Sequence, residues 1–98
     1  MAVPPIRLIF AEENPQRYLQ AAVSVSSRIF KKAVDRNRIK RMMREAYRLQ
    51  KPLLEQKLMG ANKRLSVFFI YTGKQMPEYN PLEQAMQKLL KKLIELIV

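Results

Sequence analysis

The fold of this chain is decided by residues 24–51, which read SVSSRIFKKAVDRNRIKRMMREAYRLQK. The segment holds ten basic residues against two acidic ones, Asp35 and Glu45, and so supplies +8 of the formal net charge of +11. Such a density of one sign must be solvated or neutralised by a partner, and nucleic acid is the most abundant polyanion. The segment therefore predicts a nucleic-acid-binding surface.

The spacing of apolar residues in this segment predicts a helix from about Asp35, as N-cap or first-turn residue, to about Gln50. At roughly 100° per residue, the apolar and basic side chains fall on opposite arcs. The predicted core-facing arc consists of Ile39, Met42, Met43, Ala46, Leu49 and Leu53, and the predicted outer arc of Asn37, Lys40, Arg41, Arg44, Arg48 and Lys51. Because like charges four residues apart weaken an isolated helix, we interpret the outer arc as a binding surface rather than a solvated face.

Three other segments predict strands. Residues 5–11 alternate apolar and polar, as a half-buried strand does, and residues 18–26 alternate again. The acidic turn between them, residues 12–15, is short, so we expect these two strands to be antiparallel neighbours. Residues 65–72, LSVFFIYT, are almost continuously apolar and predict a central strand that is covered on at least one face.

The rest of the chain predicts two more helical pieces. Pro52 indicates either a new short helix over residues 52–59 or a kinked continuation, ended by Gly60. Asn80 is the expected cap of the last helix, whose core-facing stripe is Leu82, Met86, Leu89, Leu90, Leu93, Ile94 and Ile97. The order is β-β-α-β-α, so we predict one α+β domain over residues 1–98, with helices packed on a small sheet.

Composition excludes several classes of site. The chain has no cysteine and no histidine, which removes disulfides, thiolate metal sites and the commonest general base. Its eight carboxylates show no spacing typical of a two-metal nuclease, and its two glycines cannot form a glycine-rich phosphate loop. We therefore expect no catalytic residue, metal site or cofactor on this chain. Without an apolar run of membrane-spanning length or a signal peptide, we expect a cytoplasmic protein with no membrane partner.

The run RNRIKR at residues 36–41, followed by REAYR at residues 44–48, closely resembles the RNR signature of the bacterial ribonuclease P protein component. The upstream SVS at residues 24–26 and KKA at residues 31–33 also resemble that family. The similarity is dense over residues 22–48 and looser but collinear over residues 6–93. An RNR triplet alone carries no information, whereas the whole run in one register is specific.

The resemblance implies a fold like the second domain of ribosomal protein S-five, in which the RNR helix joins two parallel strands by a left-handed crossover. The general rule for such connections favours the right-handed form. The family usually has a further N-terminal helix before the first strand, and this chain starts too late to contain it. Ser27 and Ala22 stand where the family commonly has lysine and glycine. We therefore expect RNA binding with poorer support of cleavage.

The resemblance also implies a function. In that family an RNA subunit with bound Mg²⁺ removes the 5′ leader of precursor tRNA, and the protein subunit binds this RNA and the leader. The expected partners are thus ribonuclease P RNA and precursor tRNA, with no small-molecule cofactor. The motif residues expected to engage RNA are Arg36, Asn37, Arg38, Lys40, Arg41 and Arg44, and the expected supporting phosphate contacts are Arg28, Lys31, Lys32 and Arg48.

Three alternatives stay open from the residues themselves. A ribosomal or other structured-RNA protein would use the same basic helix. A DNA-binding helix in the major groove would predict duplex affinity and dimerisation, for which no seam is visible. An independent nuclease would predict metal-dependent cleavage without RNA.

Overall fold

The structure, a computed structural model, describes residues 1–12 and 18–97. The elements follow in the order β1 (Ala2–Val3), β2 (Ile6–Glu12), β3 (Leu19–Val25), α1 (Ala33–Gly60), β4 (Leu65–Tyr71) and α2 (Tyr79–Ile97). The predicted α+β class and the order of the five longer elements are confirmed, and the two-residue β1 is additional. The predicted turn at residues 12–15 lies mostly outside the described residues.

The sheet has the strand order β1-β2-β4-β3. The apolar strand β4 is central, as predicted, and pairs antiparallel with β2 and parallel with β3. The prediction that β2 and β3 are neighbours is wrong, because β4 lies between them. Short connections favour adjacent strands. Here, however, the chain passes through the long helix α1 and then enters the sheet between β2 and β3, so that the most apolar strand, β4, is paired on both sides. The helix therefore joins two parallel strands, and its left-handed crossover stays a prediction.

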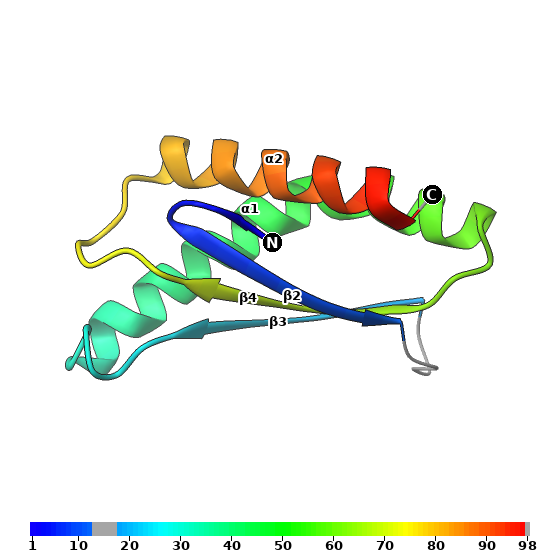
Figure 1. The fold of residues 1–98 in the computed structure, drawn as a ribbon. Helices are drawn as coiled ribbons and strands as arrows, with labels where there is room; N and C mark the ends of the chain where they lie inside the picture. The colour runs from blue at the N-terminus through cyan, green and yellow to red at the C-terminus, as the bar shows by residue number, and fades with distance from the viewer. Residues whose placement is uncertain (13–17, 98) are drawn as a thin grey trace.

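Both helices cover the same face of the sheet (Figure 1). Alternate residues of β2 and β4 point to this face and are buried, including Ile6, Leu8, Val67 and Phe69. Successive strand residues point to opposite faces, so the intervening residues form the other face, which no described helix covers. Phe68 on that face is 40% exposed.

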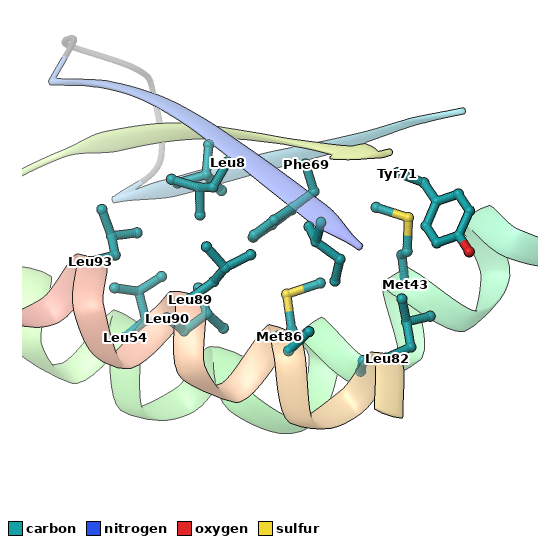
Figure 2. Close-up of a cluster of buried hydrophobic side chains, with 14 of the residues drawn as sticks. Leu8, Met43, Leu54, Phe69, Tyr71, Leu82, Met86, Leu89, Leu90 and Leu93 are labelled. Carbon is teal, nitrogen blue, oxygen red and sulfur yellow. The ribbon is translucent and has the colours of Figure 1, made fainter. Parts of the chain in front are cut away.

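The core lies between the sheet and the two helices. Figure 2 shows side chains from both layers pointing towards one another, with Leu8 and Phe69 on the sheet opposite Met86, Leu89 and Leu93 of α2. Burial of each large apolar side chain stabilises the fold by roughly 1.5–3 kcal/mol. The predicted stripe of α2 is confirmed apart from Ile94, which is half-buried. The helix begins at Tyr79, before the expected cap Asn80.

Helix α1 differs from its prediction in length and in part of its buried side. It runs through Pro52 as one 28-residue helix, so of the two predicted alternatives the continuation is confirmed and the separate piece is wrong. Its buried residues are Ile39, Met43, Ala46, Leu54 and Leu58. Leu49 and Leu53, expected in the core, are 49% and 54% exposed. Ile39, Met43 and Ala46 are thus buried as predicted, and the buried side departs from the prediction only beyond Ala46, where it passes to Leu54 and Leu58.

Helix α1 ends at Gly60, as predicted, and the left-handed residue that follows it is Asn62. Asn62 has a φ of 53°, and its N–H donates to the carbonyl of Met59 at 3.1 Å. The N–H of Lys63 donates to the carbonyl of Leu58 at 2.9 Å. This pair of hydrogen bonds is the Schellman arrangement, in which asparagine is the commonest substitute for glycine.

Candidate nucleic-acid interface

Helix α1 presents the motif residues along the side that faces away from the core. Arg38, Arg41 and Arg44 are exposed and Lys40 is half-buried; we call these four residues the cationic face. Within residues 1–12 and 18–97, none of the four side chains forms a hydrogen bond or ion pair with the protein. Asn37 is exposed beside them. The cationic face therefore has its full donor capacity available to a ligand.

The loop before α1 brings three further predicted residues to the same end of the helix. Arg28, Lys31 and Lys32 are exposed, whereas Phe30 is buried and packs against Tyr71 with ring centroids 5.8 Å apart. The N–H of Phe30 also donates to the carbonyl of Ser26 at 3.0 Å. One buried aromatic anchor thus places this loop and turns its cations outward.

Arg36 differs from the other motif residues because its guanidinium turns back to the protein. Its Nη1 donates to the carbonyl oxygens of Phe30 at 2.8 Å and Lys31 at 3.0 Å. These bonds commit part of its donor capacity to holding the preceding loop. The sequence pattern contained no sign of this contact, because it depends on the path of the loop.

Arg48 is paired on the helix surface. Its guanidinium forms two hydrogen bonds with the Glu45 carboxylate, at 2.7 and 3.1 Å, in the bidentate geometry typical of arginine. The hydrogen bond from Arg48 lowers the pKa of the Glu45 carboxyl. Both side chains are solvent-exposed, so the pair contributes little to stability. Its main effect is that the Glu45 carboxylate neutralises Arg48 at the border of the cationic face.

A groove separates α1 from the outer edge of β3. It consists of two adjoining depressions of about 350 and 320 Å³, which share Ala21 and Tyr47. Arg44 lines the first and Lys51 the second. Tyr47 packs on Phe69 with ring centroids 5.4 Å apart, and burial raises the pKa of its hydroxyl. The neutral ring thus forms a fixed wall between the two cations.

The uncovered sheet face carries an aromatic residue that the sequence could not place. Phe69 is fully buried, while its neighbour Phe68 is exposed. Ile9 of β2 and Ala22 of β3 are the register partners of Phe68. The alternation of side chains along β4 predicts that Phe68 and Phe69 lie on opposite faces of the sheet. Because both faces of this strand carry apolar residues, the sequence does not indicate which face the helices cover.

The described residues contain neither a candidate metal-binding cluster nor a candidate membrane-spanning helix. In the described part of the chain, no group of three or more acidic, histidine or cysteine side chains is placed to hold a metal ion. Among the same residues, no helix has the length and hydrophobicity needed to span a membrane.

Fold and surface together define a small, strongly cationic α+β protein whose basic side chains concentrate on one long helix and the loop before it. The sequence model of the family described as Ribonuclease P matches residues 2–94, and the chain belongs to this family. The prediction made from the RNR run is thereby confirmed.

Individual relatives agree with this assignment. A ribonuclease P protein component from Porphyromonas gingivalis is 38% identical over 90 residues, which cover 90% of this chain and 66% of the relative. Those from Chlorobaculum tepidum and Chlorobium phaeobacteroides are 34% and 33% identical, over 58% and 54% of their own lengths. The chain therefore spans less than two thirds of the length of these relatives. No solved structure matches it significantly.

Proposed function

We propose that this chain is the protein subunit of a bacterial ribonuclease P, which binds the catalytic RNA and the 5′ leader of precursor tRNA in the cytoplasm and so assists 5′ maturation of tRNA. Family membership supports the class of protein. The observation that carries the RNA-binding role is the cationic face of α1, where Arg38, Lys40, Arg41 and Arg44 make no bond to the protein within the described residues.

The proposed chemistry is charge neutralisation and positioning. Arginine presents a planar fork of donors that matches two phosphate oxygens, and lysine adds a point charge. Asn37 can donate and accept hydrogen bonds, so it suits a sugar or base edge at the same surface. In this proposal the phosphodiester is hydrolysed by the RNA subunit, which binds the Mg²⁺, and no residue of this chain acts as acid, base or nucleophile.

The structure favours a division of roles among the predicted residues. The cationic face makes the direct phosphate contacts, joined by Arg28, Lys31 and Lys32 from the preceding loop. Arg36 holds that loop, and Arg48 contributes less because Glu45 neutralises it. Neutralising about five phosphates predicts a slope of log K against log salt of roughly −3 to −5.

Reconstitution tests this proposal. The protein is mixed with a ribonuclease P RNA and precursor tRNA at low Mg²⁺, and release of the 5′ leader is measured against the RNA alone. We expect stimulation by the protein and its loss in a variant with Arg41 and Arg44 changed to alanine. Absence of stimulation together with equal affinity for ribosomal RNA fragments in competition binding would instead assign the chain to another structured RNA.

A further inference from the structure

A second groove lies between α1 and α2 and belongs to the helical layer. It consists of two adjoining depressions of about 450 and 500 Å³, which meet at Leu53. Residues 50–61 border it on one side and residues 87–95 on the other, and no described strand residue lines it. Because both helices cover the sheet with their other sides (Figure 1), this helix-pair groove opens away from the sheet.

The floor of the helix-pair groove is apolar. Leu53 of α1 is exposed and lines the groove together with Leu90 and Ile94 of α2. Leu49, one turn before Leu53 on α1, is also exposed and extends the apolar surface. A partner that covers these side chains would remove apolar area from water, which favours association. The groove is therefore suited to an apolar partner surface.

The rim of the groove is nearly neutral, unlike the rest of this strongly basic protein. Lys91 and Glu95 are exposed and one turn apart on α2, and within the described residues neither side chain forms an ion pair or hydrogen bond. Lys57 is the one other charged residue of the described lining, which thus carries +1 of the formal +11. Gln50 and Gln87 add amides that both donate and accept hydrogen bonds.

Such a surface can be complementary to itself. Two-fold symmetry brings the same patch of two copies face to face. If the two α2 helices run antiparallel, Lys91 of one copy faces Glu95 of the other, and the same pair forms a second time across the axis. Each glutamine amide can likewise bond to an amide of the other copy.

From this arrangement we propose that the helix-pair groove is the interface of a homodimer, in which α2 of each copy lies antiparallel in the groove of the other. The result is a stack of four layers, with two helical layers inside and the two uncovered sheet faces outside. The inference concerns a surface other than the cationic face and does not depend on the proposed function.

Other occupants fit the groove less well. A polyanion is bound by an excess of cations, whereas the described lining has two lysines against one glutamate. An anionic membrane surface favours a helix with a uniformly basic polar side, and Glu95 interrupts that side on α2. A second copy supplies both the apolar surface and the opposite charges.

The dimer should be weak and should tighten as salt is added. Each copy carries a formal net charge of +11, and repulsion between like charges opposes association. Salt screens this long-range repulsion and leaves the apolar contact in place. We expect a dissociation constant of roughly 10–100 μM at moderate salt. Association through bound RNA would show the opposite salt dependence.

Sedimentation equilibrium of the nuclease-treated 98-residue chain at several salt concentrations tests the proposal. Leu53→Glu places a charge on the apolar floor and should weaken the dimer at least about tenfold. Leu96→Glu is the matched control, because Leu96 is an exposed leucine of α2 that lines neither depression. The control should dimerise like the wild type. Circular dichroism verifies that both variants are folded.

Charge reversal tests the antiparallel arrangement. Lys91→Glu and Glu95→Lys each place like charges opposite one another at both pairs, so each variant alone should dimerise about tenfold more weakly. An equimolar mixture of the two restores both attractive pairs and should recover the wild-type affinity as a heterodimer. Net charge cannot explain this result, because the first variant lowers the charge of the chain and the second raises it.

Several outcomes would overturn the proposal. A wild-type chain that stays monomeric at about 1 mM and high salt would leave the groove to a different protein. A dimer that survives Leu53→Glu would use another surface, and one that salt or nuclease dissolves would be bridged by RNA. Charge variants whose mixture recovers nothing would exclude the antiparallel pairing. Because no RNA is present in these measurements, their failure leaves the proposed function untouched.

Discussion

The guanidinium of Arg36 donates a hydrogen bond to the carbonyl oxygen of Phe30, six residues earlier, at a distance of 2.8 Å. The first arginine of the RNR run is therefore tied to the loop that it follows, and Phe30 is tied in turn to Tyr71 of the sheet. Through these two contacts a motif residue on the helix fixes where the loop cations point.

This contact makes Arg36 different from Arg38 in a way that can be measured. We expect Arg36→Ala to lower the free energy of unfolding by about 1.5–3 kcal/mol, because hydrogen bonds from a charged donor are lost. It should also reduce the steepness of the salt dependence by more than the roughly 0.7–0.9 expected for one phosphate contact, since Lys31 and Lys32 lose their placement.

Arg38→Ala is the control for that experiment, because Arg38 is exposed and has no partner within the described residues. The stability of this variant in urea should equal that of the wild type. The slope of log K for RNA binding against log salt should become shallower by roughly 0.7–0.9, the value for one phosphate contact. Wild-type stability of the Arg36 variant would show that the loop does not depend on this residue.

Arg44 should act on binding alone. Its replacement by alanine is expected to weaken RNA binding by roughly 1–3 kcal/mol, because one charge-assisted hydrogen bond to a phosphate oxygen is lost. The thermal midpoint should stay unchanged because the side chain is exposed. Titration calorimetry and a thermal melt of the same variant separate the two effects; a lowered midpoint would mean that Arg44 has a structural role.

Glu45 should restrain RNA binding through Arg48. The Glu45→Gln substitution removes a negative charge beside the cationic face and releases the Arg48 guanidinium, so we expect tighter binding, most visibly at low salt where exposed charges are least screened. Glu83→Gln, on α2, serves as a charge-matched control. Equal affinities of the two variants and the wild type would contradict this role.

The same pair predicts a pH dependence. Arg48 holds the pKa of the Glu45 carboxyl below its usual range. The stabilisation from the pair is therefore present above the pKa of the unfolded chain and is lost as the pH falls through the lower folded pKa. Carbon-detected NMR titration should return this pKa towards its ordinary value in Arg48→Ala; an unchanged pKa would exclude the pairing in solution.

The two glycines should respond in opposite ways to alanine. A Cβ at Gly73 would collide with the hydroxyl and ring of Tyr71, whose Oη donates to the carbonyl of Gln75 at 2.7 Å. We expect Gly73→Ala to destabilise the fold by about 1–3 kcal/mol through overpacking. Gly60→Ala meets no atom within 4 Å in the last turn of α1 and should be neutral or stabilising by up to about 1 kcal/mol.

Chemical denaturation of both glycine variants checks this difference, with near-ultraviolet circular dichroism to follow the tyrosine environment. Equal stability of the Gly73 variant and the wild type would mean that the Tyr71 ring moves without cost. A destabilised Gly60 variant would place a steric restriction where the structure shows open space.

The elements that depend on local order could be predicted from the order of residues along the chain. Period and composition located α1, α2, β2, β3 and β4, because helix and strand repeats are set by neighbouring residues. The charge of residues 24–51 predicted a nucleic-acid-binding surface, and the RNR run with its flanking residues indicated the family to which the chain belongs. These properties need no knowledge of which segments meet.

How these elements meet became clear from the packed fold alone. It placed β4 between β2 and β3, turned Leu49 and Leu53 to solvent, exposed Phe68, and directed Arg36 to the carbonyl of Phe30. Each of these outcomes depends on packing between residues that are distant in sequence. The local pattern alone is compatible with more than one choice of buried side chains. The direction of α1 over the sheet therefore selected which apolar residues entered the core and which cations border β3.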